Sequence, residues 1–225
     1  MLVAEKLCHA FKDTQVLNGV HLTVSEGETV ALVGPSGSGK TTLLYCLAGL
    51  LRPDAGKVSF RGADIVGLGE QERSALRRTS FGFVFQSAEL VPELTLRENI
   101  ELPLELTGVA GKERRRRTDE LLERLGLGAQ SGKRPAKVSG GQAQRAAVAR
   151  AVAHRPAVVF ADEPTGALDT ANGATVTDLL LDLAKESGSS IVLVTHDRDL
   201  AARAGRTVEL LDGAVVVNSL TADAS

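Results

Sequence analysis

The chain has 225 residues, of which 43% are hydrophobic, and its 26 basic and 28 acidic residues give a formal net charge of −2. This length is ample for a buried core, and the balanced charge argues against a nucleic-acid-binding protein, which usually carries a basic excess. Cys8 and Cys46 are far apart and match no metal or redox spacing, so we expect reduced thiols. Charged residues occur near the start, so we expect no signal peptide. No apolar run approaches ~18 residues, so we expect no membrane span.

The N-terminal region predicts strands. Residues 2–11 and the alternating stretch 20–24 indicate half-buried strands, and the β-branched run 29–33 is typical of a buried parallel strand. Phe11 stands out because aromatic residues make up only 3% of the chain. It suits stacking on a purine, but an isolated phenylalanine on a strand is more often part of the core. His9 has no ligand partner nearby and is expected on the strand surface.

A glycine-rich loop follows the run 29–33. Residues 34–41, GPSGSGKT, match G-x-x-x-x-G-K-[ST] in full, and leucines at helical spacing over 43–51 predict a helix behind the loop. Such a loop turns backbone N–H groups and the positive end of the helix toward a phosphate. Lys40 suits the β- and γ-phosphates of a nucleotide, and Thr41 offers a hydroxyl to Mg²⁺. The residues predicted to cradle the phosphates are Gly34, Pro35, Ser36, Gly37, Ser38, Gly39, Lys40, Thr41 and Thr42.

The middle of the chain changes character. Residues 81–85 predict a buried strand, and Gln86 at its carboxyl end is placed to touch a ligand, although an ordinary loop position fits equally well. From 87 to 138 the pattern predicts helices in a lobe inserted into the sheet domain. The basic run 112–117 suggests nucleic acid or lipid headgroups, but nearby acidic residues favour a solvated, charge-balanced helix face.

Further polar groups gather at predicted helix and strand ends. In VSGGQ, residues 138–142, Ser139 is a suitable N-cap for an alanine-rich helix, and the glycines leave N–H groups for an anion. The apolar strand 157–161 runs into Asp162 and Glu163, a pairing suited to a Mg²⁺ ligand beside a water-activating base but also to an ordinary turn. The apolar strand 191–195 is followed by His196. Because the carboxyl ends of parallel strands share one edge of a sheet, these groups are expected to meet the glycine loop there.

With these motifs in view, the chain resembles the nucleotide-binding subunit of ABC transporters over nearly its whole length. VSGGQ is close to the family signature LSGGQ, and FGFVFQ, PELTLRENIELPL, ADEPTGALD and VTHD look most like the branch for lipoprotein release, macrolide or peptide export and cell division. The resemblance implies an α/β fold: a P-loop NTPase core of the RecA type with a mainly parallel sheet, an N-terminal antiparallel β subdomain and an inserted helical subdomain. It implies one ABC ATPase domain over 1–225, with the β subdomain and P-loop core in 1–86 and 151–225 and the helical subdomain in 87–150.

The resemblance also assigns roles in hydrolysis. Thr41 and Gln86 would ligate Mg²⁺, and Asp162 would hold the ion through water. Glu163 would be the base that polarises the attacking water, and His196 would contact the γ-phosphate.

Other family roles concern the nucleotide base and the second cassette. Phe11 falls where the family's adenine-stacking aromatic lies, which favours stacking over a core position. Asp169, with His196, would help couple two subunits. The signature would cap the γ-phosphate of ATP bound to the opposite chain, so that two chains sandwich two ATP molecules. The signature residues predicted to bind the nucleotide are Ser139, Gly140, Gly141 and Gln142.

The implied function is an ATP-hydrolysing subunit that uses ATP and Mg²⁺, dimerises with a second copy of itself and drives a separate integral membrane permease. It would lie in the cytoplasm, peripheral on the inner face of the cell membrane, with no nucleic-acid partner. Two alternatives stay open: a mechanotransmitting ATPase of the cell-division type, and a soluble ABC ATPase acting on nucleic acid or ribosomes. The second is less favoured, because the chain has one cassette, no sustained heptads and no basic excess.

Overall fold

A computed structural model describes residues 1–220, which form two compact units. The first unit comprises residues 1–77 and the described residues from Ser190 onward, and the second comprises residues 78–189. The chain passes between them within helix α2 (Glu70–Ser80) and at the start of strand β8 (Ser190–Val194). Each unit is described by itself below.

The first unit contains an antiparallel sheet with the strand order β2-β1-β4-β5. Its strands are β1 (Leu2–Phe11), β2 (Thr14–Val24), β4 (Ala55–Phe60) and β5 (Ala63–Asp64). The predicted alternation is confirmed, since Val20, Leu22 and Val24 are buried. The prediction for His9 is wrong: its side chain is buried, because irregular pairing of β1 with β2 on both sides of His9 turns the ring inward.

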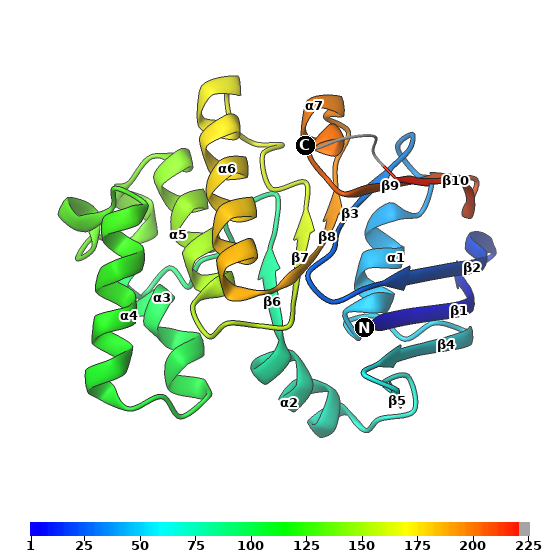
Figure 1. Ribbon diagram of the computed structural model, residues 1–225, viewed down its shortest axis with the longest axis horizontal. Helices are drawn as coiled ribbons and strands as arrows, with labels where there is room; N and C mark the ends of the chain where they lie inside the picture. The colour runs from blue at the N-terminus through cyan, green and yellow to red at the C-terminus, as the bar shows by residue number, and fades with distance from the viewer. Residues whose placement is uncertain (221–225) are drawn as a thin grey trace. The chain divides into compact units, whose positions relative to one another are not determined.

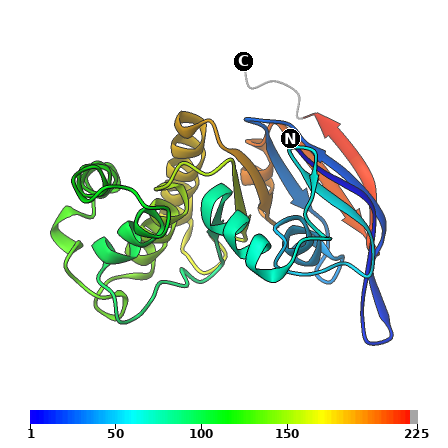
Figure 2. The same ribbon diagram turned by 90° about the horizontal axis from the view of Figure 1, so that it is seen from below.

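The same unit holds the strands that carry the glycine loop, in the order β10-β9-β3-β8. Strand β3 (Thr29–Val33) pairs in parallel with β8 and with β9 (Arg206–Leu211), and β9 forms an antiparallel hairpin with β10 (Ala214–Leu220). Helix α1 (Lys40–Leu47) contacts both β2 and β8, and the strands curve around it (Figures 1 and 2). A short helix, α7 (Arg198–Ala202), contacts β3.

Helix α1 is shorter than the leucine pattern predicts. It ends at Leu47, and the following Gly49 adopts a left-handed φ of 64°, a conformation that commonly terminates helices at glycine. Leu50 therefore lies beyond the helix and is 45% exposed, while Leu43, Leu44 and Leu47 are fully buried as expected.

The second unit packs helices beside two parallel strands, β6 (Phe81–Val84) and β7 (Val158–Asp162). Helix α5 (Gly140–Val152) is central, as Figure 1 shows. It contacts β6, helix α3 (Leu96–Leu106) and helix α6 (Thr170–Ser187). A Cβ built on Gly82 of β6 would lie 2.2 Å from the carbonyl oxygen of Ala151, so this close contact requires glycine. The helices are α3 (Leu96–Leu106), α4 (Gly111–Arg124), α5 (Gly140–Val152) and α6 (Thr170–Ser187), with short 3₁₀ turns at Gly128–Gln130 and Pro135–Lys137.

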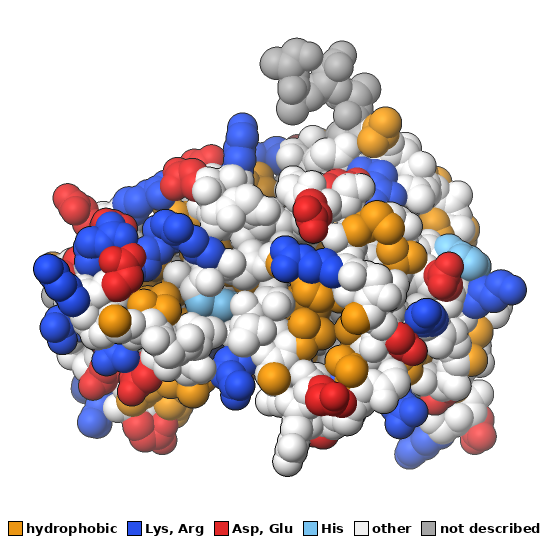
Figure 3. Space-filling view, turned by 60° about the horizontal axis from the view of Figure 1, so that its bottom comes forward, with side chains coloured by type: hydrophobic (Ala, Val, Ile, Leu, Met, Phe, Trp, Pro, Cys, Tyr) orange, Lys and Arg blue, Asp and Glu red, His pale blue; other side chains and the backbone are white. Residues whose placement is uncertain are grey.

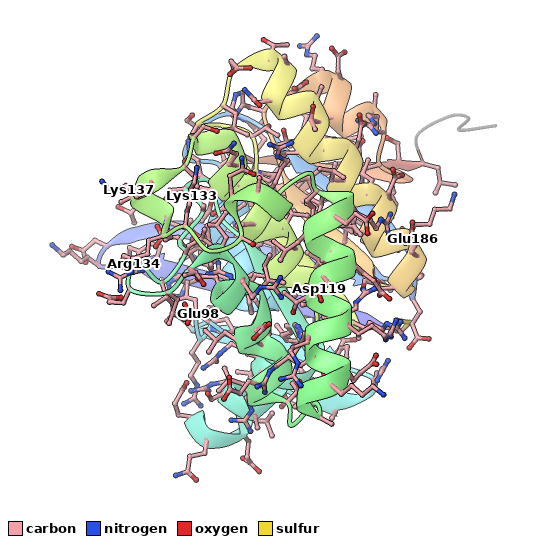
Figure 4. All side chains as sticks on the ribbon, turned by 90° about the vertical axis from the view of Figure 1, so that its left-hand side faces the viewer. Glu98, Asp119, Lys133, Arg134, Lys137 and Glu186 are labelled. Atoms are coloured by element: carbon pink, nitrogen blue, oxygen red, sulfur yellow. The ribbon has the colours of Figure 1, made fainter. Side chains whose placement is uncertain are left out.

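The basic run 112–117 lies on α4, where acidic side chains balance it. Arg116 pairs with Glu113 and Glu120 on its own helix, and Arg97 on α3 pairs with Asp119 at 2.7 Å. Over these helices, basic and acidic side chains are interspersed (Figure 3), and Figure 4 shows Asp119 on the same surface. The interpretation as a solvated, charge-balanced helix face is therefore confirmed. Within residues 1–220, no helix has the length and apolar character needed to cross a membrane.

Candidate functional site

The glycine loop in the first unit is tightly packed around Lys40. The Lys40 side chain is buried, and its Nζ donates hydrogen bonds to the carbonyl oxygens of Gly34, at 2.9 Å, and Pro35, at 2.8 Å. A Cβ on Gly34 would lie 2.1 Å from the carbonyl oxygen of Leu210, and Gly39 adopts a φ of +98°. The loop therefore needs glycine at both positions to bend around the ammonium group.

The start of α1 leaves polar groups for a ligand. The N-cap residue Gly39 has no side chain that could cap the N–H groups of the first helical turn. The Oγ of Ser38 is buried and has no hydrogen-bond partner among the described residues. An anion with several oxygens, such as a phosphate, would satisfy these donors.

The strand ends of this unit meet at a hollow of about 550 Å³. It is lined by Gly34 and Pro35 at the end of β3 and by the segment after β8 that contains His196. Strands β3 and β8 are parallel neighbours, which brings their carboxyl ends together as predicted. The structure thus places His196 beside the beginning of the glycine loop.

Phe11 lies at the end of β1 with 52% of its surface exposed, so it is not a core residue. Its ring meets the ring of His9 edge to face, with 4.7 Å between centroids. Asp54 supports this corner, because its Oδ2 accepts a hydrogen bond from the Ala10 N–H at 2.7 Å and lies 3.3 Å from Nδ1 of His9. An exposed aromatic ring on a supported backbone is suited to stacking on a planar ligand.

In the second unit, β7 ends at Asp162, and the next residue, Glu163, has a φ of +46°. A left-handed conformation is unfavourable for glutamate, and such strain is often found at functional positions. The turn after it is closed by a 3.0 Å hydrogen bond from the Gly166 N–H to the Glu163 carbonyl oxygen.

The side chains of Gln86 and Glu163 both lie close to Gly166. A Cβ built on Gly166 would be 3.0 Å from Nε2 of Gln86 and 3.2 Å from Oε2 of Glu163. Gln86 follows β6 and Glu163 follows β7, which pair in parallel, so the sequence prediction that these ends share an edge holds within this unit.

The VSGGQ segment begins α5 as predicted. Ser139 is its N-cap: Oγ accepts a hydrogen bond from the Gln142 N–H at 3.2 Å, and Oε1 of Gln142 accepts from the Ser139 N–H at 3.0 Å. In this capping box, the Gln142 side-chain oxygen is hydrogen-bonded to the backbone at the start of α5. The Ser139 hydroxyl acts there as an acceptor, so its proton is available to a ligand. The segment leading into this helix carries Lys133, Arg134 and Lys137 (Figure 4).

Asp169 is linked to the signature by one residue, Asn172. It is the N-cap of α6, and its carboxylate accepts hydrogen bonds from the backbone N–H of Asn172, at 3.0 Å, and from Nδ2 of Asn172, at 2.6 Å. These bonds hold the pKa of Asp169 below its usual range, so the carboxylate is ionised at neutral pH. The other side of Asn172 faces Gly141, whose Cβ would lie 2.8 Å from the Asn172 Oδ1.

Residues 17–166 match the family model described as ABC transporter. The chain belongs to the ABC transporter family. It is 46% identical to the lipoprotein-releasing system ATP-binding protein LolD of Aquifex aeolicus over 216 residues, which cover 96% of both chains. It is 46% identical to the macrolide export ATP-binding/permease protein MacB of Nitrosomonas europaea over 93% of this chain and 32% of that protein. The chain thus spans about a third of the length of the ATP-binding/permease proteins it matches.

Solved structures agree with this assignment. The dimeric structure of MJ0796, a bacterial ABC transporter cassette, matches with a TM-score of 0.91 and 38% identity over 99% of this chain and 100% of that one. A dimeric post-hydrolysis state of MJ0796 bound to ADP and Pi matches with the same TM-score of 0.91 and 37% identity. The predicted fold is confirmed, with an antiparallel N-terminal sheet, mainly parallel core strands and a helical region. The chain is an ATP-binding, ATP-hydrolysing cassette of an ABC transporter.

The predicted site residues of the ABC cassette fall into two groups. The first unit brings together the glycine loop and His196 and also carries Phe11. The second unit brings together Gln86 and Glu163, and the signature with Asp169; Asp162 ends its strand β7. Between residues 1 and 220 there is no cluster of three His, Cys, Asp or Glu side chains able to hold a metal ion. The predicted donors are hydroxyl, amide and carboxylate oxygens, which suit Mg²⁺ that is held mainly by phosphates and water.

Sequence reasoning missed two side chains that support these groups. Gln144 on α5 is 2% exposed, and its Nε2 donates hydrogen bonds to the carbonyl oxygens of Phe85, which precedes Gln86, and of Pro164, which follows Glu163. Asn172 connects Asp169 to Gly141. One signal was present for Gln144: it shares an i, i+3, i+4 face with Ala147 and Val148, so an amide there must be buried.

Proposed function

We propose that this cassette powers a membrane complex of the export or lipoprotein-release type, in which a separate integral membrane permease is driven by ATP binding and hydrolysis. The observation that carries the proposal is the match to a lipoprotein-releasing ATP-binding protein over 96% of both lengths. In that arrangement the cassette would act from the cytoplasmic face of the membrane as a peripheral subunit. We also propose the division into a P-loop core, 1–86 and 151–225, and a helical subdomain, 87–150.

The two groups of residues have proposed roles in nucleotide binding and hydrolysis. Lys40, the α1 N–H groups and the Ser38 hydroxyl bind the phosphates, which replace the loop carbonyls as partners of the Lys40 ammonium. Thr41, Gln86 and Asp162 would hold Mg²⁺, the first two directly and Asp162 through water, and the ion would neutralise charge on the phosphates. Glu163 orients and deprotonates the attacking water, and His196 contacts the γ-phosphate.

We propose that two copies of the chain sandwich two ATP molecules. The structural relatives named above are dimeric cassettes, one of them bound to ADP and Pi. The Ser139 hydroxyl and the N–H groups of Gly140 and Gly141 would contact the γ-phosphate bound to the other copy, at the positive end of α5. Asp169 and His196 would help to couple the two copies across the same contact.

The sandwich predicts that Mg²⁺ with a non-hydrolysable ATP analogue shifts the chain from monomer to dimer, measured by size exclusion with light scattering. Ser139→Asp should stay monomeric, because aspartate keeps the N-cap of α5 but places a negative charge against the phosphate. Ser139→Thr is the matched control and should dimerise, since it keeps both the cap and the hydroxyl. Dimerisation of the Asp variant at parental analogue concentrations would contradict the proposed signature contact.

Phe11 is proposed to stack on adenine, and this assignment has its own test. Phe11→Ala should raise the KM for ATP by about 5- to 100-fold, as expected for a base–aromatic contact of ~1–3 kcal/mol, and should change thermal stability little because the ring is 52% exposed. Phe11→Tyr should behave like the parent. Steady-state kinetics and thermal melts decide the matter: a large loss of stability with an unchanged KM would make Phe11 a structural residue.

A further inference from the structure

We propose that Gln144 is a positioning residue that sets the placement of Gln86 and Glu163 from the helix that carries the signature. This inference rests on the proposed roles of those two residues in hydrolysis. Gln144 itself is not proposed to touch the nucleotide.

The hydrogen bonds of Gln144 are directed at the two catalytic segments. Its Nε2 donates to the carbonyl oxygen of Phe85 and to that of Pro164, both at 2.8 Å. A side-chain amide nitrogen has two hydrogens, and here each one is used by a different strand end. Phe85 immediately precedes Gln86, and Pro164 immediately follows Glu163.

These carbonyls lie where the paired strands have ended. The parallel ladder of β6 and β7 stops at Val84 and Ala161, so the backbone beyond it has lost its regular partners. Gln144 replaces those partners with one planar group, which fixes the distance between the two segments. The side chains of Gln86 and Glu163 then both lie close to Gly166. Since Gln144 is 2% exposed, water cannot easily take over either bond.

The position of Gln144 on α5 gives this arrangement a second consequence. Helix α5 begins at Gly140 after the Ser139 cap, so Gln144 lies two residues beyond the signature and little more than one turn from Ser139. A helix moves as a rigid element, and its buried alanines and Gly141 pack closely against its neighbours. Movement of the signature end on meeting the other copy's ATP would therefore be transmitted to Gln86 and Glu163 through one buried amide.

A purely stabilising role is the competing explanation, and the chain offers a matched control. Asn99 on α3, in the same unit, is also fully buried and uses its Nδ2 to hold backbone carbonyls, among them Val91 at 3.1 Å and Thr95 at 2.9 Å. None of its bonded partners adjoins Gln86 or Glu163. Replacing either amide by an apolar side chain leaves buried carbonyls unsatisfied, so both changes should lower the melting temperature.

The experiment compares Gln144→Met and Gln144→Leu with Asn99→Leu in the full chain. For the Gln144 variants we expect kcat to fall about 10- to 100-fold, because a displacement of about 1 Å at reacting groups has effects of that order. The affinity for a fluorescent ATP analogue, which depends on the first unit, should stay within about twofold of the parent. Asn99→Leu should show a comparable loss of melting temperature with kcat within about twofold. The methionine variant keeps an unbranched chain and decides the test if the leucine variant does not fold.

The possible failures are distinguishable. A parental kcat in a folded Gln144 variant overturns the inference, as does an equal loss of kcat in Asn99→Leu, which would reduce both effects to stability. Glu163→Gln is assayed beside them. If that variant retains the parental rate, the proposed role of Glu163 fails; if it is inactive while Gln144→Met is fully active, only the positioning role fails.

Discussion

Glu163→Gln should lower ATP turnover by about 10²- to 10⁴-fold, the usual contribution of a positioned general base. Glutamine keeps the shape of the side chain and can still lie near Gln86 and Gly166, but it cannot accept the proton of the attacking water. Binding of ATP should be unchanged, because the glycine loop and Lys40 belong to the other unit and are not altered. Phosphate release and fluorescent-analogue titration measure the two quantities separately.

A matched control for this variant is Glu123→Gln, which makes the same charge change on exposed α4 in the same unit. Turnover there should stay near the parental rate, since surface substitutions of this kind rarely exceed about 0.5 kcal/mol. Parental turnover by Glu163→Gln would refute the assignment of the base. Loss of ATP affinity in that variant, with hydrolysis lost as a result, would instead make Glu163 a binding residue.

Buried strands were predictable because their signal is local. The run 29–33 coincides with β3, and 81–85 and 157–161 differ from β6 and β7 by a residue at their ends. In each case a short β-branched or aromatic run is bounded by polar or glycine residues, and burial on both faces leaves few other conformations for it. The expectation that neighbouring carboxyl ends share an edge followed from the general behaviour of parallel sheets, and it holds for β3 with β8 and for β6 with β7.

The details that support the site depend on contacts between distant residues, and no local pattern encodes them. His9 is buried because irregular pairing in β1 redirects it, and its Asp54 partner is 45 residues away in the sequence. Gln144 bonds to residues 59 and 20 positions away. The left-handed backbone of Glu163 is likewise set by the turn to Gly166. Sequence motifs predict the reacting groups, whereas the groups proposed to orient them emerge only from the folded chain.

Lys40→Met should weaken ATP binding by about 10- to 100-fold, corresponding to the loss of a charge-assisted hydrogen bond of ~1.5–3 kcal/mol. Methionine keeps the length and much of the apolar stem of lysine, so the buried space beside the loop stays filled. Adenosine, which has no phosphate to meet the ammonium, should bind the variant and the parent alike. The difference between the two ligands therefore isolates the phosphate contact from any general change in the site.

The same substitution removes the two bonds that hold the carbonyls of Gly34 and Pro35, so the nucleotide-free variant should melt at a somewhat lower temperature. Thermal melts over an ATP concentration series test both effects, because ligand stabilisation grows with the ratio of ligand concentration to Kd and should appear only at higher ATP in the variant. Lys57→Met, an exposed lysine of the same unit, is the matched control and should follow the parental series. If Lys40→Met also gave the parental series of melting temperatures, the loop would bind ATP without the Lys40 ammonium, and Lys40 would serve only to hold the two carbonyls.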